Sequence, residues 1–346
     1  MSKQYHTLVL IGRFQPFHNA HLEIIQRAKT LANQLVIITG SDKQPRTYKN
    51  PFTSKERANM IYDATRGMLQ YDFNIHVEAM HDTLYNDQAW VARIQGIVSK
   101  YMCLGYKTGL IGHKKDMSSE YLDMFPQWDF INVETIEPLN ATNIRDLYFK
   151  HDANMSFIKD VVPQTTFEFL MNFRHSEETH EAWSQVIKER EFVATYKKQY
   201  SSLPYPPVFV TTDAVVIQSG HVLMIKRRSE PGKGLWALPG GFLNADTDKS
   251  VQACAIRELK EETGIKVPVP VLIGSIKDSH VFDAIDRSTR GRTITHAFKI
   301  VLPDGELPKV KGLDDAEKAK WIPLSELDSS VCYEDHFELI KYFVGS

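Results

Sequence analysis

The chain turns from a predicted strand to a predicted helix at Gly12-Arg13-Phe14-Gln15-Pro16-Phe17-His18-Asn19-Ala20-His21. A compact apolar run at 7–11 precedes this stretch, and apolar residues with helical spacing follow it at 20–31. Gly12 allows a tight backbone turn, and His18 and His21 are three residues apart, so they share a helix face. Because a helix N-terminus carries partial positive charge and free N–H groups, this turn is a candidate phosphate site, and two capping or core histidines are the alternative.

The rest of the first half alternates between strands and helices. Short apolar runs predict strands at 35–39, 74–79, 109–112 and 130–134. Apolar spacing and polar caps predict helices at 54–64, 87–99 and 142–150. Because strands that alternate with helices form parallel βαβ units, we expect an α/β, Rossmann-like domain with a parallel sheet.

The second half has a different pattern. Residues 155–198 are rich in helix formers and charge, and the proline-containing stretch 201–207 marks a boundary. Strand-like segments at 208–217 and 221–226 predict a hairpin, and one clear helix follows at 250–263. We therefore expect an α+β fold here, with a first domain at 1–178, a helical linker at 179–206 and a second domain at 207–346.

Charge and composition limit the classes of function. The 346 residues carry 41 Lys and Arg against 43 Asp and Glu, a formal net charge of −2. This balance argues against a bulk nucleic-acid binder. Three widely spaced cysteines predict neither a disulfide framework nor a cysteine metal site, and no apolar run approaches the roughly 18 residues of a membrane span. We expect a cytoplasmic protein with no membrane or nucleic-acid partner, and the oligomeric state, a homo-oligomer included, stays open.

The first half resembles the nucleotidylyltransferase superfamily. The strand followed by GxFxPxHxxH is similar to its HxGH signature, with Ala20 in the place of the usual glycine. Its second signature resembles Ala141-Thr142-Asn143-Ile144-Arg145, with Ala141 in the place of the usual serine. Class I aminoacyl-tRNA synthetases share HxGH, and Lys115-Asp116-Met117-Ser118-Ser119 is faintly similar to their second motif. The neutral charge and the turn at Arg145 favour the transferases.

Three further stretches are similar to the archaeal-type nicotinamide mononucleotide (NMN) adenylyltransferases. They are Asn50-Pro51-Phe52-Thr53-Ser54-Lys55-Glu56-Arg57, Asn86-Asp87-Gln88-Ala89-Trp90 and Gly112-His113-Lys114-Lys115-Asp116. The resemblance implies that His18, His21 and Arg145 act on the phosphates of ATP. It implies an ATP and NMN site of Gly12, Arg13, Phe14, Arg57, Asn86, Asp87, Trp90, His113 and Thr142. Trp90 would stack on the nicotinamide ring, and a core role is the alternative for it.

The second half carries a cluster of carboxylates after a pair of glycines. Glu258, Glu261 and Glu262 follow Gly240-Gly241 and lie at positions i, i+3 and i+4 of the predicted helix. Like charges at this spacing repel each other unless a cation holds them, and a hard divalent ion meets that need. A solvated helix face is the alternative.

The glycine pair and the RExxEExG run resemble the Nudix box. Seven residues separate Gly241 from Lys249, a longer spacer than usual, and Lys249 stands where the box has a glutamate. Asp246 or Asp248 could substitute for it. The resemblance implies a hydrolase that uses Mg²⁺ or Mn²⁺, held by Gly241, Glu258, Glu261 and Glu262.

Residues outside the box resemble ADP-ribose pyrophosphatases. The similar stretches are Phe282-Asp283, 287–298 and 312–317 before Trp321. They imply that ADP-ribose is bound by Arg257, Phe282, Asp283, Arg287, Arg290 and Arg292. For the arginines, the alternative is that they belong to a solvated loop. Glu317 is a candidate general base.

The order of the two halves is similar to the bifunctional adenylyltransferase–Nudix proteins. The resemblance implies partners ATP, NMN and ADP-ribose, with NAD synthesis in the first domain and ADP-ribose hydrolysis to AMP and ribose 5-phosphate in the second. A second domain that senses a nucleotide without turnover, or that cleaves another nucleoside diphosphate derivative, is the alternative.

Overall fold

The computed structural model of the chain describes residues 3–69, 73–114, 117–134 and 140–345. These residues form two compact units, Met1–Ile187 and Lys188–Ser346. The division falls inside helix α7 (Glu177–Lys198), within the segment 179–206 that we expect to link the domains. None of the helices in the described part of the chain is long and apolar enough to cross a membrane.

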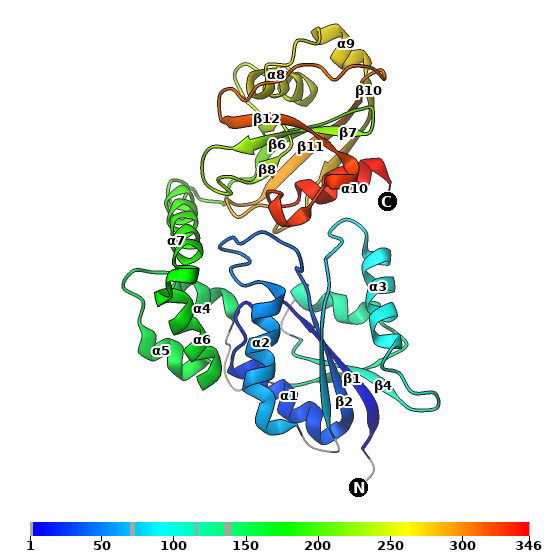
Figure 1. Ribbon diagram of the computed structural model, residues 1–346, viewed down its shortest axis with the longest axis vertical. Coiled ribbons are helices and arrows are strands. Elements are labelled where there is room, and N and C mark those ends of the chain that lie inside the picture. The colour runs from blue at the N-terminus through cyan, green and yellow to red at the C-terminus, as the bar shows by residue number, and fades with distance from the viewer. Residues whose placement is uncertain (1–2, 70–72, 115–116, 135–139, 346) are drawn as a thin grey trace. The chain divides into compact units, whose positions relative to one another are not determined.

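The first unit is built on a parallel sheet with the strand order β3-β2-β1-β4-β5 (Figure 1). Every strand pair in it is parallel. The strands are β1 (Tyr5–Gly12), β2 (Ala32–Thr39), β3 (Asn74–Ala79), β4 (Thr108–Gly112) and β5 (Asp129–Asn132). Because all five run in one direction, the residues that follow them gather at one edge of the sheet, where ligands of such folds bind.

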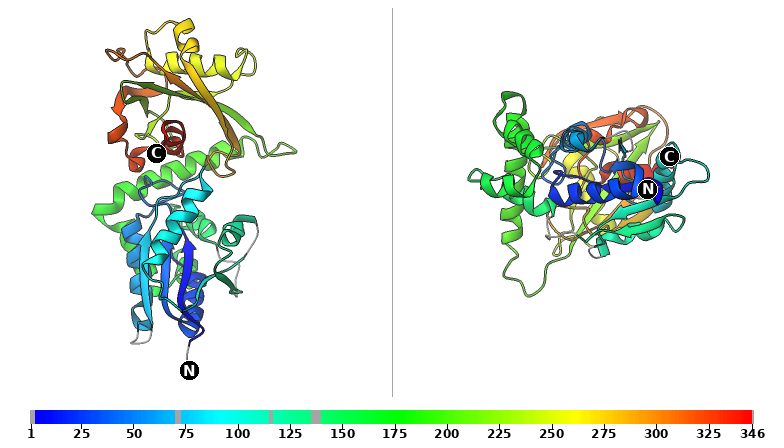
Figure 2. Two further views of the ribbon diagram at one scale, coloured as in Figure 1. Left: turned by 90° about the vertical axis from the view of Figure 1, so that its right-hand side faces the viewer. Right: turned by 90° about the horizontal axis from the view of Figure 1, so that it is seen from below.

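Helices cover both faces of this sheet (Figure 2). Leu8 and Leu10 of β1 belong to one core, while Val9 belongs to the other, as the two-residue period of a strand requires. The helices are α1 (Asn19–Leu31), α2 (Ser54–Thr65), α3 (Asp87–Ser99), α4 (Ala141–Tyr148), α5 (Met155–Val161) and α6 (Gln164–His175), with short turns η1 (Arg66–Met68) and η2 (Met117–Met124).

The second unit contains a mixed sheet with the order β10-β11-β6-β7-β12, in which β8 pairs with β7 and β9 pairs with β6. The pair β6–β11 is parallel, and the other pairs are antiparallel. The strands are β6 (Phe209–Gln218), β7 (His221–Arg227), β8 (Trp236–Ala237), β9 (Gly240–Phe242), β10 (Ile276–Phe282), β11 (Thr293–Val301) and β12 (Ala316–Pro323).

Helices α8 (Val251–Thr263) and α10 (His336–Val344) cover opposite faces of this sheet, and α9 (Val269–Gly274) follows α8 (Figure 2). Two short turns, η3 (Leu324–Glu326) and η4 (Ser329–Val331), precede α10. The face of α8 with Ala255, Ile256 and Leu259 is buried in the core of the sheet. The opposite face of α8 is therefore left to present its charged residues.

Both expected fold classes are confirmed. The parallel sheet is the predicted α/β architecture, and the second unit combines a sheet with few helices, as predicted. The helix expected at 250–263 is α8, which Ser250 caps by accepting a hydrogen bond from the backbone N–H of Ala253 at 3.1 Å. The strand expected at 35–39 begins earlier, at Ala32, because the buried Ala32 already pairs with Tyr5 of β1.

Candidate active sites

The turn between β1 and α1 is fixed by hydrogen bonds to its backbone and to the side chain of Gln15. Gln15 donates to the carbonyl of Phe52 at 2.9 Å and accepts from its N–H at 3.0 Å. Arg57 donates to the carbonyl of Arg13 at 2.8 Å, and Arg145 donates to the carbonyl of Gln15 at 2.7 Å. Two distant segments, at 52–57 and at Arg145, therefore hold one short turn, and Gln15 is a contributor to which we assigned no role from the sequence.

The two histidines of this turn lie together at the N-terminus of α1. The ring centroids of His18 and His21 are 3.7 Å apart, and the backbone N–H of His18 donates to Nδ1 of His21 at 3.2 Å. The rings of Phe14 and Phe17 lie 4.7 and 5.5 Å from the ring of His21. A Cβ atom at Gly12 would lie 3.0 Å from the ring of Phe14, so any other residue here would require that ring to shift. The aromatic rings thus orient both imidazoles.

Two buried arginines supply positive charge beneath the turn. Arg145 also donates to the hydroxyl of Thr142 at 3.1 Å, and Arg57 also donates to the carbonyl of Gly40 at 2.6 Å. Burial lowers the pKa of each arginine to about 10, so both stay cationic at neutral pH. The buried Nε of each has no hydrogen-bond partner among the described residues. Each arginine therefore keeps one donor that the protein leaves unused.

Trp90 and its neighbours lie near the carboxyl end of β3. The indole N–H of Trp90 donates to Asp82 at 3.3 Å. The side chain of Asn86 caps α3 by accepting from the backbone N–H of Ala89 at 2.9 Å, and Asp87 is exposed in the first turn. Asp82 is thus a second residue to which we assigned no role from the sequence. It fixes the indole ring that we expect to stack on nicotinamide.

His113 and Lys114 follow β4 at the same edge of the sheet. Nδ1 of His113 lies 2.9 Å from the carbonyl of Val133, and the backbone N–H of Lys114 donates to the side chain of Asn132 at 3.0 Å. The loop after β4 is thereby tied to the end of β5. Lys115 and Asp116, and the side chains of residues 117–119, lie outside the described residues.

The second unit contains a cavity of about 600 Å³. Of the residues that we expect to hold metal or substrate, it is lined by Gly241, Arg257, Glu258, Glu261, Glu262, Arg287 and Arg290. Phe282, Asp283, Arg292 and Glu317 are not among its lining residues. Phe282 is fully buried against aromatic rings of α10, and Glu317 pairs with Lys226 at 3.7 Å.

The glycine pair and the glutamates of α8 are packed against each other. A Cβ atom at Gly240 would overlap the carbonyl oxygen of Thr212, and one at Gly241 would lie 2.6 Å from the carboxylate of Glu258. The buried carboxylate of Glu262 accepts a hydrogen bond from the backbone N–H of Gly240 at 2.8 Å. The two glycines are therefore needed for the close approach of the carboxylates.

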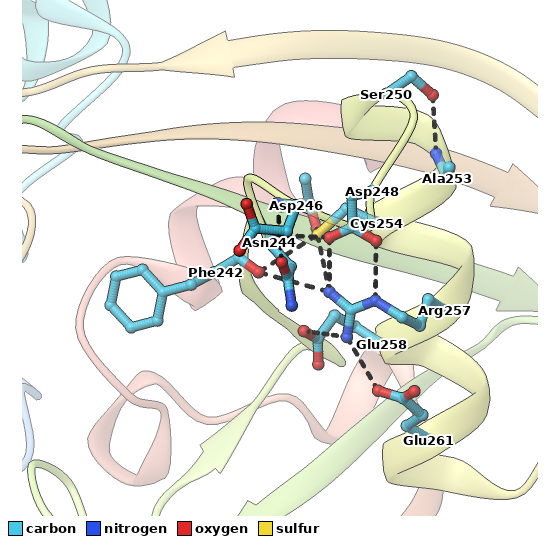
Figure 3. A network of polar contacts seen from close by, with 11 residues as sticks. Phe242, Asn244, Asp246, Asp248, Ser250, Ala253, Cys254, Arg257, Glu258 and Glu261 are labelled. Carbon is cyan, nitrogen blue, oxygen red and sulfur yellow. Dashed lines mark hydrogen bonds and ion pairs between the residues drawn. The ribbon is translucent and has the colours of Figure 1, made fainter.

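Arg257 is the cation that the acidic residues share (Figure 3). It donates to both carboxylate oxygens of Asp248 at 2.7 and 2.9 Å, to Glu258 at 2.7 Å and to Glu261 at 2.9 Å. The pairing with Arg257 holds the pKa of Asp248 well below its usual range. Asp248 therefore joins the carboxylate cluster through an arginine.

Two nearby residues are exposed: Asp246 of the spacer and Lys249, which follows the spacer. The lysine that replaces the glutamate of the box thus lies at the surface. Of the two acids that could substitute for that glutamate, Asp248 is the one that the structure brings to the cluster.

The chemistry of this donor set fits a hard divalent ion. Burial raises the pKa of Glu262 to about 8 and also raises the pKa of Glu258, and neighbouring carboxylates add to both shifts. In the described part of the chain, no three His, Cys, Asp or Glu side chains already converge as a metal site, and Arg257 lies among the carboxylates. The donors are oxygen atoms with excess negative charge, which Mg²⁺ and Mn²⁺ prefer.

The floor of the cavity holds an acid to which we assigned no role from the sequence. Asp213 of β6 accepts from the hydroxyl of Thr295 at 2.6 Å and lies 3.8 Å from Nδ1 of His336. A single acid inside an otherwise uncharged strand is the sequence signal that could have pointed to it. Arg287 also lines the cavity, but it is buried and paired with Asp335 through two bonds of 2.9 Å.

Comparisons with known proteins agree with this division. The cytidylyltransferase-like family matches residues 9–147, and the NUDIX domain family matches residues 208–343. The folds and sites thus define a nucleotidylyltransferase joined to a Nudix domain. A bifunctional NMN adenylyltransferase/ADP ribose pyrophosphatase from Francisella tularensis is 34% identical over 98% of both chains, with a TM-score of 0.91. A crystal structure of such a protein from the same organism, complexed with AMP and a Mn ion, gives a TM-score of 0.90. This chain belongs to the family of bifunctional NMN adenylyltransferases/ADP-ribose pyrophosphatases.

Two further relatives each match about half of the chain. A nicotinamide/nicotinic acid mononucleotide adenylyltransferase from Acinetobacter baylyi is 39% identical over 171 residues, which cover 49% of this chain and 87% of the relative. An ADP-ribose pyrophosphatase from Methanocaldococcus jannaschii is 34% identical over 160 residues, which cover 46% of this chain and 83% of the relative.

Proposed function

We propose that the first domain transfers AMP from ATP to NMN, giving NAD and pyrophosphate, and that the second hydrolyses ADP-ribose to AMP and ribose 5-phosphate. The observation that carries this proposal is the full-length likeness to the Francisella enzyme, with both sites present in their own units. The purified chain should form NAD from ATP and NMN, and AMP from ADP-ribose, each with Mg²⁺. A missing product would refute the corresponding half.

In the first domain, a phosphate oxygen of NMN attacks the α-phosphorus of ATP, a new P–O bond forms, and the bond to pyrophosphate breaks. Such transfers need positioning and charge neutralisation more than covalent help. His18 and His21 contact the phosphates, with His21 nearest the α-phosphate, and Arg13 and Arg145 hold the β- and γ-phosphates. Gly12, Phe14 and Thr142 shape the turn around them.

The nicotinamide end of NMN lies at the carboxyl ends of β3 and β4. Trp90 stacks on the ring, and Asn86, Asp87 and His113 line the same edge of the sheet. Arg57 is fully buried and donates to the carbonyl of Arg13, so we assign it the role of holding the turn.

In the second domain, water attacks a phosphorus of the pyrophosphate, and the bond to the bridging oxygen breaks. Gly241, Glu258, Glu261 and Glu262 would hold Mg²⁺ or Mn²⁺, which supplies charge neutralisation and a more acidic water when bound. The Mn ion in the complex of the Francisella protein supports this choice of metal. Arg257 keeps Glu258 and Glu261 in place.

Arg290 is the cation of the cavity that we assign to the substrate. Its buried Nε has no hydrogen-bond partner among the described residues. Arg287 acts through Asp335, with which it is paired.

A nucleotide sensor without turnover is the second candidate for the Nudix domain. The observation that favours it is Lys249, which replaces an acidic residue of the box. Turnover of ADP-ribose with Mg²⁺ separates the two functions, and a panel of other nucleoside diphosphate derivatives tests substrate choice.

We further propose domain bounds of 1–178 and 207–346 with a helical linker between them, which the family matches at 9–147 and 208–343 support. A cytoplasmic location suits the three free cysteines. Limited proteolysis and cell fractionation test these two points.

A further inference from the structure

We propose that the second half of α7 takes part in substrate binding by the Nudix domain. In this proposal, Phe192 of α7 and Phe242 of β9 form a wall on which the purine base of ADP-ribose stacks. The proposal rests on the proposed hydrolysis of ADP-ribose, and it gives a binding role to a segment that lies outside the matched Nudix family region, which begins at residue 208.

The position of Phe192 is the first observation. Residues from Lys188 onward belong to the second unit. Phe192 lines the same cavity as Glu258, Glu261 and Arg257. Its side chain is 37% exposed, and so is that of Phe242, which also lines the cavity. Two large apolar rings at the rim of a charged cavity are thus open to a ligand.

A continuous series of aromatic contacts holds these rings in place. Phe192 stacks on Tyr196 with 6.3 Å between ring centroids, and Tyr196 lies 5.8 Å from Phe209 of β6. Phe209 in turn contacts Phe242 edge-on at 5.7 Å. The end of α7 is therefore packed onto Phe209 of β6, which in turn contacts β9, so Phe192 is held relative to the cavity.

The wall adjoins the cation that we assign to the substrate. The guanidinium of Arg290 lies 4.8 Å from the ring centroid of Phe242. One face of Phe242 therefore meets this cation, while the ring of Phe192 is equally exposed. A ligand that stacks on the wall can reach Arg290 with its phosphates, because the two features are in contact.

The other aromatic rings of the cavity are buried. Tyr333 is 2% exposed, and the guanidinium of Arg227 lies 4.1 Å above its ring. His336 is buried at the floor. Among the described lining residues, Phe192 and Phe242 are thus the rings available for stacking.

The chemistry of ADP-ribose decides which end meets this wall. A purine base has an extended flat face, and stacking on aromatic side chains is favourable and independent of base identity. The pyrophosphate requires the charged part of the cavity at α8, and ribose 5-phosphate has no flat ring to stack. The base therefore lies against Phe192 and Phe242, with the rest of the substrate directed to the polar lining.

Kinetics of the full-length enzyme with Phe192→Ala test the proposal. We expect a rise of roughly 10- to 100-fold in KM for ADP-ribose with kcat changed less than about twofold, as the loss of one stacking contact implies. Inhibition of hydrolysis by AMP should weaken by a similar factor, while inhibition by ribose 5-phosphate should stay unchanged. Phe192→Trp should restore both values, and NAD synthesis should be unaffected. Tyr205→Ala, which removes an 81% exposed ring that does not line the cavity, is the matched control.

Three results would overturn the proposal: an unchanged KM and unchanged AMP inhibition in Phe192→Ala, weaker inhibition by ribose 5-phosphate alone, or an equal effect of Tyr205→Ala. Equal thermal midpoints of the variants and the wild type exclude misfolding as the cause. If the wild type does not hydrolyse ADP-ribose, the proposed function fails. Titration with AMP and Mn²⁺, with a non-hydrolysable ATP analogue filling the first site, then still shows whether Phe192→Ala weakens binding.

Discussion

The two candidate sites have opposite arrangements of charged side chains. In the first unit, two imidazoles lie at a helix N-terminus above Arg57 and Arg145, which are buried and cationic. In the second unit, Asp248, Glu258 and Glu261 are paired with Arg257, and Glu262 is packed against the glycine pair. One site brings its own positive charge, and the other brings an excess of negative charge.

The difference explains how one chain of nearly neutral net charge can have two sites for phosphorylated ligands. A site with its own cations neutralises phosphate directly. A site with excess carboxylate must recruit a divalent ion first, and that ion then neutralises the pyrophosphate. Each site should therefore fail independently when its own charged groups are removed.

The largest expected effect is on hydrolysis in Glu262→Gln. Removal of this buried carboxylate should lower ADP-ribose hydrolysis by about 10²- to 10⁴-fold, as for loss of a metal ligand or proton acceptor. NAD synthesis should change less than about twofold, because the first site keeps all of its own charged groups. Both rates are measured on one preparation, with the exposed Glu326→Gln as control. A loss of both activities in folded protein would show that the sites are not independent.

The reverse variant is His21→Ala. NAD formation from ATP and NMN should fall by about 10²- to 10³-fold, because a donor aimed at the reacting phosphate is lost. Hydrolysis of ADP-ribose should stay close to the wild-type rate. The exposed His175→Ala is the matched control. Unchanged NAD synthesis in His21→Ala would remove the imidazole from the mechanism.

A smaller effect tests the role of Asp248. In Asp248→Asn the ion pair with Arg257 is lost, so Arg257 shifts its bonds to Glu258 and Glu261 and competes with the metal for them. We expect about a tenfold loss of hydrolysis, partly restored by higher Mg²⁺. Asp246→Asn, at an exposed position of the same spacer, should have no effect. Equal rates in the two variants would contradict a supporting role for Asp248.

The smallest expected effect concerns pH and stability. Burial lowers the pKa of His336 to about 3 in the folded protein, while the unfolded chain takes up the proton near pH ~6.5. The neutral, buried His336 therefore contributes to the free energy of unfolding at any pH above about 6.5. This contribution is lost as the pH falls towards 3, by at most about 1.4 kcal/mol per pH unit. Thermal unfolding at neutral and at mildly acidic pH should show a shallower fall in His336→Asn than in the wild type. An equal fall in the thermal midpoint of both proteins would assign the acid sensitivity to other groups. His221→Asn is the control variant.

Much of this architecture was predictable from local patterns. The strand–turn–helix stretch at 12–21 and the alternation of strands and helices indicated the parallel sheet, since side-chain periodicity is a local property. The spacing of Glu258, Glu261 and Glu262 is enough to place them together on one helix. The partners of these groups were not predictable, because Gln15 with Phe52, and Arg257 with Asp248, meet only through tertiary packing.

The sequence by itself determined the fold classes and the order of the two domains, and it supplied the candidate charged groups of each site, because periodicity and motif spacing act over a few residues. Only the tertiary structure decided that Arg287 pairs with Asp335, that Asp213 and His336 form the cavity floor, and that α7 contributes Phe192 to the second unit. These are contacts between residues far apart in the chain, and burial and geometry choose them only once the sheets and helices have packed.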